Sequence, residues 1–189
     1  MKKWIIVAVV VIIAAGTVMY FNVGMEAENK VSTEKALVIS PEMERALQLP
    51  PDPGEAGKQT LEGIDSDHDG VRDDMQRWIA VSQQEAPAVR AALRQMVRAQ
   101  QAYILKADSD IDVVLANADK QSMANECLGY LIGGYSVMDI SDALRAQMLN
   151  TKARSLAYVT ADGKLSGHFF PVLKFKASSC DFDPANPPD

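Results

Sequence analysis

The chain has 189 residues, of which 48% are hydrophobic and 23% are charged, and this balance is typical of a globular protein rather than a disordered one. Nineteen Lys and Arg against 25 Asp and Glu give a net charge of −6. This excludes nucleic acid as the expected partner, because phosphate binding requires a basic excess. Two His and two Cys leave few ligands for a catalytic zinc site or a zinc finger.

The chain begins with a segment that is typical of export. Residues 4–21 carry no charge and follow Lys2 and Lys3. Their length comes close to the roughly 20 residues that span a bilayer as a helix, whereas the core of a cleaved signal peptide has about 7–15. We therefore expect residues 1–21 to form a signal anchor, a transmembrane helix that is not cleaved. The alternative is cleavage after Ala14, Ala15 and Gly16, which would release a secreted chain.

The charges on either side of this segment predict its orientation. Cytoplasmic flanks are rich in Lys and Arg, so Lys2 and Lys3 should stay in the cytoplasm. The residues after 21 would then lie in the periplasm or outside the cell, and one transmembrane span would hold them to the inner membrane. All 25 acidic residues and 17 of the 19 basic residues belong to this exported part, whose net charge is −8. Such an acidic exported part does not resemble a polybasic lipid-binding module. A protein partner is compatible with this charge.

Cys127 and Cys180 are the two cysteines of the chain. Outside the cytosol an even pair tends to be oxidised, so we expect a disulfide between them. Such a bridge would pin the C-terminal tail to the helix that contains Cys127. Two unrelated buried thiols are the alternative.

Residues 22–59 read as a Pro-rich tether. They contain a short helical candidate at 41–47, followed by Pro50, Pro51 and Pro53, which favour an extended backbone. Residues 60–183 should form the folded domain, and residues 184–189 a loose tail. The hydrophobic periodicity and capping residues of this domain predict a mainly α fold of about four helices. We expect these helices at 73–82, at 87–104, from 108 or 109 to 131, and from 139 or 141 to 158.

Two features complete the predicted domain. Asp162 and Gly163 read as a turn after the last helix. Residues 165–175 are expected to form a short hairpin or an extended C-terminal arm.

The sequence with the most specific chemistry is an Asp-rich loop at the start of this domain. Asp65, Asp67 and Asp69 are two residues apart, and Gly70 follows at once. Calcium takes 6–8 hard oxygen ligands, and a glycine at the sixth position permits the sharp turn around the ion. The spacing therefore predicts a calcium loop that begins at Asp65. An Asp-rich turn that caps the next helix without metal is the alternative.

This run resembles the calcium loops of EF-hands, dockerins and thrombospondin type 3 repeats. The longer stretch 50–79 also resembles bacterial exported proteins that carry one such loop. The resemblance implies that the backbone carbonyl of Val71 is a ligand, and that Asp73 binds directly or through water. Position 12, where EF-hands have a bidentate Glu, is Gln76 in this chain. One neutral oxygen there implies weaker binding, roughly 10⁻⁴–10⁻³ M. Asp74 is a further candidate to complete the shell.

Other metals fit the loop less well. Mg²⁺ demands strict octahedral geometry and gives up water reluctantly. His68 occupies the outward-facing fourth position, where a zinc role is not expected. Calcium is therefore the predicted ion.

These features predict a membrane-tethered exported domain that is stabilised by one structural calcium ion and acts as an interaction or structural module. The alternative is an exported enzyme that uses a cleft between helices, with calcium purely structural. A general acid–base cluster is missing from the sequence, since His168 is the only His besides His68. This favours a module that is not an enzyme.

Overall fold

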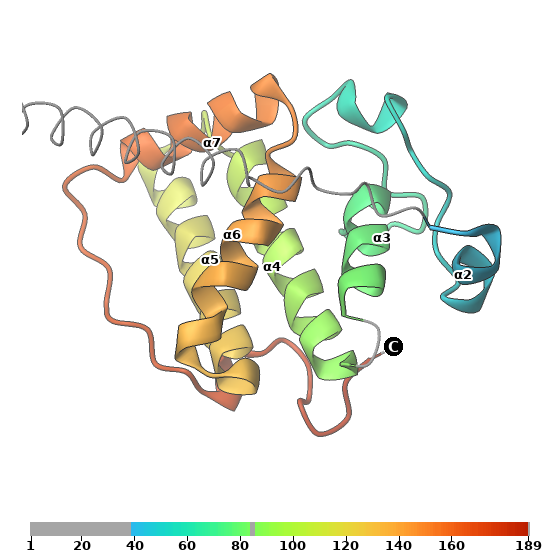
Figure 1. The fold of residues 1–189 in the computed structure, drawn as a ribbon. Coiled ribbons are helices and arrows are strands. Elements are labelled where there is room, and N and C mark those ends of the chain that lie inside the picture. Colours follow the sequence, from blue (N-terminus) through green and yellow to red (C-terminus); the bar gives the residue numbers. More distant parts are fainter. Residues whose placement is uncertain (1–38, 84–85, 189) are drawn as a thin grey trace, which may run out of the picture. The chain divides into compact units, whose positions relative to one another are not determined.

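The computed structural model describes residues 39–83 and 86–188, and residues 41–189 belong to one compact unit. This unit is mainly helical, as predicted (Figure 1). Its elements in chain order are α2 (Pro41–Ala46), the 3₁₀ turn η1 (Ala56–Lys58), α3 (Asp73–Ser82), α4 (Pro87–Leu105), α5 (Ile111–Ile132), α6 (Gly134–Met148), α7 (Lys152–Lys164) and the 3₁₀ turn η2 (Ala177–Ser179).

The predicted membrane anchor at residues 1–21 lies outside the residues that the structure describes. The same is true of the tether up to residue 38. Within the described ranges, 39–83 and 86–188, no helix combines the length and the apolar character needed to span a bilayer.

Helix α4 is the centre of the unit, and α3, α5, α6 and α7 all pack against it (Figure 1). It begins at Pro87, because proline at the first helical position loses no hydrogen bond and already has a helical φ. The small side chains of Ala91, Ala92 and Ala99 are buried on α4 and allow neighbouring helices to approach closely. The main core joins this face to Val71 and to buried side chains of α3, α5 and α6.

The single helix expected up to residue 158 is wrong, because the chain breaks between α6 and α7. The hydroxyl of Thr151 accepts a hydrogen bond from the backbone N–H of Arg154, which makes Thr151 the N-cap of α7. Such a cap satisfies a backbone donor that a new helix would otherwise leave free. Asp162 and Gly163, expected to form a turn, instead lie in the last turn of α7. Likewise Gly133 ends α5, but the next residue already begins α6.

The C-terminal region returns along the bundle without forming a strand among the described residues, so the hairpin alternative is wrong and the extended arm is confirmed. The predicted disulfide is confirmed: Cys127 of α5 is bonded to Cys180, with Cα atoms 4.8 Å apart. Gln95 of α4 adds two hydrogen bonds to the tail, donating to the carbonyl of Ser179 and accepting from the N–H of Asp181.

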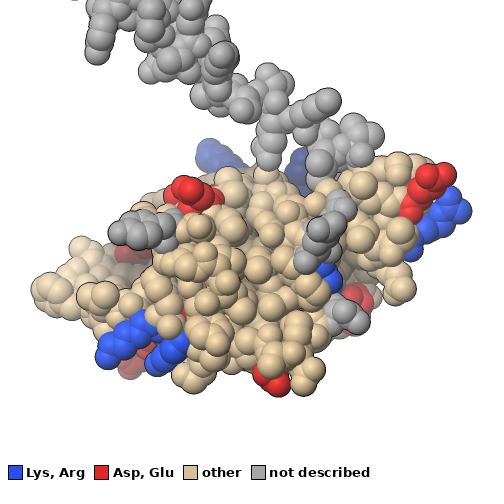
Figure 2. All heavy atoms as spheres, turned by 60° about the horizontal axis from the view of Figure 1, so that its bottom comes forward, with Lys and Arg blue, Asp and Glu red and all other residues tan. Residues whose placement is uncertain are grey.

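The lower end of the bundle shows few charged side chains (Figure 2). In Figure 2, which turns the lower end of Figure 1 forward, most of the visible surface is uncharged. Acidic and basic side chains occur there singly or in small groups near the edges.

Candidate metal site

The Asp-rich loop lies immediately before α3 and is fixed at both ends. The N–H of Asp73 donates a 2.8 Å hydrogen bond to the carbonyl of Ile64, which closes the loop at its base. Gly70 has a φ of +84°, a left-handed conformation that side chains rarely adopt. His68 also has a positive φ, at 61°, and its side chain is exposed. The loop therefore turns sharply at the positions where calcium loops turn.

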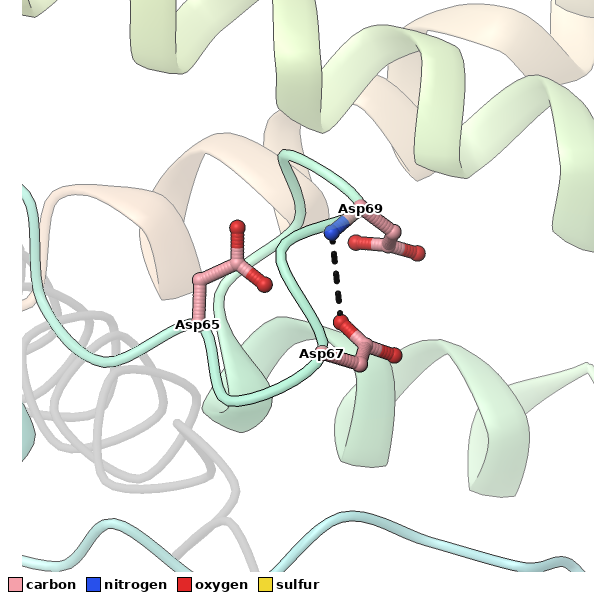
Figure 3. Close-up of side chains that lie close together, drawn as sticks. All are labelled: Asp65, Asp67 and Asp69. Carbon is pink, nitrogen blue, oxygen red and sulfur yellow. Dashed lines mark hydrogen bonds between the residues drawn. The ribbon is translucent and has the colours of Figure 1, made fainter.

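Three carboxylates converge within this loop. One oxygen from each of Asp65, Asp67 and Asp69 lies within 4.8 Å of the other two, and the side chains turn toward one another (Figure 3). Two oxygens bound to one calcium at 2.3–2.6 Å can be at most about 5 Å apart. The triad therefore has the spacing that a single metal ion requires.

Backbone donors orient these carboxylates. Asp65 accepts from the N–H of Gly70 at 3.0 Å, Asp67 from the N–H of Asp69 at 3.3 Å, and Asp69 from the N–H of Val71 at 2.7 Å. In each case the hydrogen bond involves one oxygen of the carboxylate. The turn therefore holds the side chains in place, while Asp65 and Asp69 each keep one oxygen outside these backbone hydrogen bonds.

Two buried oxygens in the loop region have no hydrogen-bond partner among the residues that the structure describes. They are Oδ1 of Asp65 and Oε1 of Gln76. Gln76 is only 6% exposed, and its Nε2 donates to Oδ2 of Asp67 at 2.9 Å. A buried polar oxygen without a partner is costly, roughly 1–3 kcal/mol. A cation at the triad would satisfy the Asp65 oxygen as it is placed, and it would satisfy the Gln76 oxygen once the amide rotates, so the residues present fit a metal ion.

The loop carboxyls titrate differently because their neighbours differ. Partial burial, together with the neighbouring carboxylates of Asp67 and Asp69, raises the pKa of Asp65. The amide of Gln76 lowers the pKa of Asp67 by donating a hydrogen bond to its carboxylate. Like charges at this spacing repel one another, and a cation would relieve that repulsion.

Val71 and Asp73, two other predicted ligands, belong to the loop, but their side chains are not part of the triad. The side chain of Val71 is fully buried in the core, which fixes the position of its peptide. Asp73 is 1% exposed, and its Oδ1 accepts from both the N–H and the hydroxyl of Ser66. This oxygen of Asp73 therefore closes the loop internally, and its carboxylate is not part of the triad.

Asp74, the further candidate for the shell, is not part of the triad and is bound by other side chains. Arg72 donates to both of its oxygens, at 2.9 and 2.8 Å, and Asn150 donates to Oδ2. Burial tends to raise the pKa of Asp74, but the hydrogen bonds and charge of Arg72 lower it. The structure thus places Gln76, rather than Asp74, beside the three carboxylates.

Two buried arginines hold the framework around the loop, and sequence reasoning missed both. Arg72 is 1% exposed and also donates to the carbonyl of Met148, at the end of α6. Arg154 is fully buried and donates to the carbonyls of Gly57, Thr60 and Leu61. Burial and the nearby charge of Arg72 lower the pKa of Arg154. Nothing in the sequence distinguishes these arginines from exposed ones.

Two cavities of moderate size lie near these elements. One, of about 260 Å³, is bordered by Asp67 and Gln76 on the loop side and by residues 47–50 on the other. The second, of about 300 Å³, has Arg98, Lys120 and Asp181 around an apolar floor. Neither cavity is lined by a histidine or a cysteine. The first cavity adjoins Asp67, one of the three carboxylates.

No family model, no curated protein and no solved structure matches this chain. The similarity to calcium loops therefore rests on residues 65–76 and on the geometry described above.

Proposed function

We propose that this chain is an exported domain, tethered to the inner membrane by its N-terminal segment, whose Asp-rich loop binds one structural Ca²⁺. The observation that carries the proposal is the triad of Asp65, Asp67 and Asp69, together with the partnerless oxygens of Asp65 and Gln76. In a metal-free turn that caps the next helix, we would expect these side-chain oxygens to accept hydrogen bonds from the turn itself. Unpaired oxygens beside the triad are instead expected of a loop that binds a cation.

The donor set favours calcium over other divalent metals. All its members are oxygens, and neither sulfur nor histidine nitrogen belongs to the triad. Calcium accepts irregular shells of 6–8 oxygens, which three carboxylates, the Val71 carbonyl and the Gln76 amide could begin to fill. Water from the adjoining cavity would supply the remainder.

The physical role of the ion is to fix the start of the helical domain. The loop connects the segment held by Arg154 to α3, and the buried Val71, Met75 and Ile79 continue directly from it into the core. By neutralising the negative charge of the carboxylates, the ion would make this connection more rigid. We propose that the resulting surface serves structural or protein-interaction purposes at the membrane.

Thermal unfolding in calcium and in chelator tests the proposal. A ligand that binds the folded state stabilises it by RT ln(1 + [Ca²⁺]/Kd), about 2.7 kcal/mol at one hundred times Kd. The Asp67→Asn variant should lose most of the calcium-dependent rise in melting temperature. Asp52→Asn is the matched control, because Asp52 caps an exposed turn outside the loop and should leave the rise unchanged. Equal melting temperatures with and without calcium would refute the proposal.

Membrane extraction tests the tether separately. The full chain should remain with membranes after carbonate washing, whereas a fragment that begins at Glu26 should be soluble. Release of a chain that begins at Thr17 would show cleavage and contradict the tether, without bearing on calcium.

A further inference from the structure

The C-terminal arm, residues 165–176, exposes several large apolar side chains close together in the sequence. Phe169 is 100% exposed and Val172 is 86% exposed, while Phe170, Leu173 and Phe175 are between 37% and 42% exposed. Single exposed apolar residues are ordinary, but a contiguous group of this kind marks an interaction surface. In Figure 1 the arm runs from the end of α7 down the side of the bundle.

This exposure does not result from a loose end, because the arm is attached at both ends. Before the arm, Lys164 donates from Nζ to the carbonyl of Ser109. At the other end, the ring of Phe175 lies against Gly129 and Gly134, where an added Cβ would clash with it. Just beyond it, Cys180 is bonded to α5. The two ends of the arm are therefore held, which restricts where residues 169–173 can lie and lowers the entropic cost of binding.

The local charge of the arm is opposite to that of the whole chain. Between Asp162 and Asp181 the sequence contains three lysines and no acidic residue, although the chain has a net charge of −6. Glu126 of α5 lies near this segment, 3.8 Å from Lys176, and offsets part of the positive charge. Salt screens charges beyond about 8–10 Å, so the arm's own lysines dominate what a nearby surface experiences. Exposed aromatic side chains beside lysines are typical of segments that lie at a membrane interface.

The spacing of the exposed residues argues against pairing with the edge of a partner's sheet. Phe169 and Val172 are three positions apart, and the two-residue period of a strand would place them on opposite faces. Pro171 lies between them and has no N–H to donate. From 169 to 173 the main chain forms no hydrogen bond with any described part of the chain, so its polar groups need water or lipid headgroups.

From these observations we propose that the arm is a second membrane contact: Phe169, Phe170 and Val172 enter the interface of an anionic phospholipid bilayer, and Lys174 and Lys176 lie at its headgroups. This contact is distinct from the tether predicted at residues 1–21. It would hold one side of the helical bundle against the bilayer.

Site-specific fluorescence on the full chain tests this contact. An environment-sensitive fluorophore is attached at Val172→Cys, with the Cys127–Cys180 disulfide verified by mass spectrometry. The control is Gln59→Cys, next to η1, which lies on the other side of the bundle in Figure 1. The probe surfaces are vesicles of phosphatidylcholine alone and of phosphatidylcholine mixed with phosphatidylglycerol. Because both labelled chains carry residues 1–21, recruitment by the tether affects them equally.

We expect a blue shift and quenching by lipid-borne quenchers at position 172, but not at 59, and only with phosphatidylglycerol present. Replacing Lys174 and Lys176 by Gln should weaken the arm's partition about 25-fold, since a lysine near an anionic surface contributes about five-fold. An unshifted spectrum at 172, or equal shifts at 172 and 59, would overturn the proposal. A shift of equal size in neutral vesicles would overturn the anionic assignment. A shift that follows protein density rather than lipid composition would indicate self-association of the arm instead.

Discussion

Gln76 donates a hydrogen bond from its Nε2 to Oδ2 of Asp67, 2.9 Å away, and thereby links the first turn of α3 to the Asp-rich loop. The same amide leaves its Oε1 buried and unpaired. In the proposed calcium-bound state the amide would rotate to present this oxygen to the ion, whereas in this structure its N–H₂ group stabilises the nearest carboxylate by a hydrogen bond. On this proposal Gln76 would serve both states of the loop, and a Glu at this position would serve one.

Replacing Gln76 by Glu should tighten calcium binding and destabilise the calcium-free protein. A carboxylate supplies a bidentate charged ligand at position 12, but without the ion it faces Asp67 as a like charge in a partly buried place. We expect the free energy of unfolding in chelator to fall by roughly 1–3 kcal/mol. Chemical denaturation in calcium and in chelator measures both effects, with the exposed Gln59→Glu as control. An equal loss of unfolding free energy in calcium and in chelator would contradict the assignment of Gln76 as a ligand of the ion.

Arg154 should be among the most sensitive positions of the fold. Replacing it by Met leaves the carbonyls of Gly57, Thr60 and Leu61 without their donor, and buried unpaired groups cost roughly 1–3 kcal/mol each. We expect a loss of about 3 kcal/mol or more in denaturant unfolding. Arg154→Lys keeps the charge but not the planar fork, so it should recover only part of this loss. Full recovery by Lys would show that charge, rather than geometry, holds the segment.

The disulfide should stabilise the domain mainly by restricting the unfolded chain. Cys127 and Cys180 are 53 positions apart, and the chain-entropy model assigns such a loop about 4 kcal/mol. The double variant Cys127→Ser/Cys180→Ser should therefore unfold at lower denaturant, and its tail should exchange amide hydrogens faster. Unchanged protection of residues 177–181 would show that the hydrogen bonds of Gln95 suffice to hold the tail.

Glu126 should make the attachment of the arm sensitive to acid. Its carboxylate accepts from the hydroxyl of Ser179 at 2.6 Å and from the N–H of Lys174 at 2.7 Å. The hydrogen bond from Ser179, followed by that from Lys174, lowers the pKa of Glu126 below its ordinary value of 4.5. The stabilisation that the Glu126 carboxylate gives to the attached arm is therefore complete above pH 4.5, and it is lost as the pH falls through the lowered pKa of Glu126.

Hydrogen exchange of the arm against pH tests this relationship. Protection at Lys174 should decrease on acidification in the wild-type protein. In Glu126→Gln it should be weak at every pH, because the charged acceptor is gone. An identical pH profile in both proteins would rule out Glu126 as the group responsible.

Local patterns in the sequence were sufficient for most helices and for the loop. Pro87 predicts the start of α4 because a fixed φ acts within one turn, and the alternation of Asp before Gly70 predicts converging carboxylates because the spacing itself defines a turn. The disulfide was predictable because the chain offers a single pair of cysteines.

What the sequence could not predict depends on contacts between distant segments. The break after Met148 requires Thr151 to act as an N-cap rather than as an interior residue, and Arg154 becomes buried only through partners about 94 positions away. The ring of Phe175 lies on Gly129 of α5 and Gly134 of α6, a contact between distant segments that no local pattern indicates. Hydrophobic periodicity indicates which face of a helix is apolar, but it does not indicate which distant carbonyl will accept a hydrogen bond from a buried side chain.

A calcium titration followed residue by residue in the backbone NMR spectrum distinguishes a calcium loop from a metal-free turn. We expect one ion to bind per chain, in the range of roughly 10⁻⁴–10⁻³ M, with the largest shifts on the amides of residues 65–76, including that of Gly70, which is bonded to Asp65. The Asp67→Asn variant should abolish them. Unmoved loop amides at millimolar calcium, or shifts that persist unchanged in Asp67→Asn, would show that the Asp-rich loop does not bind calcium.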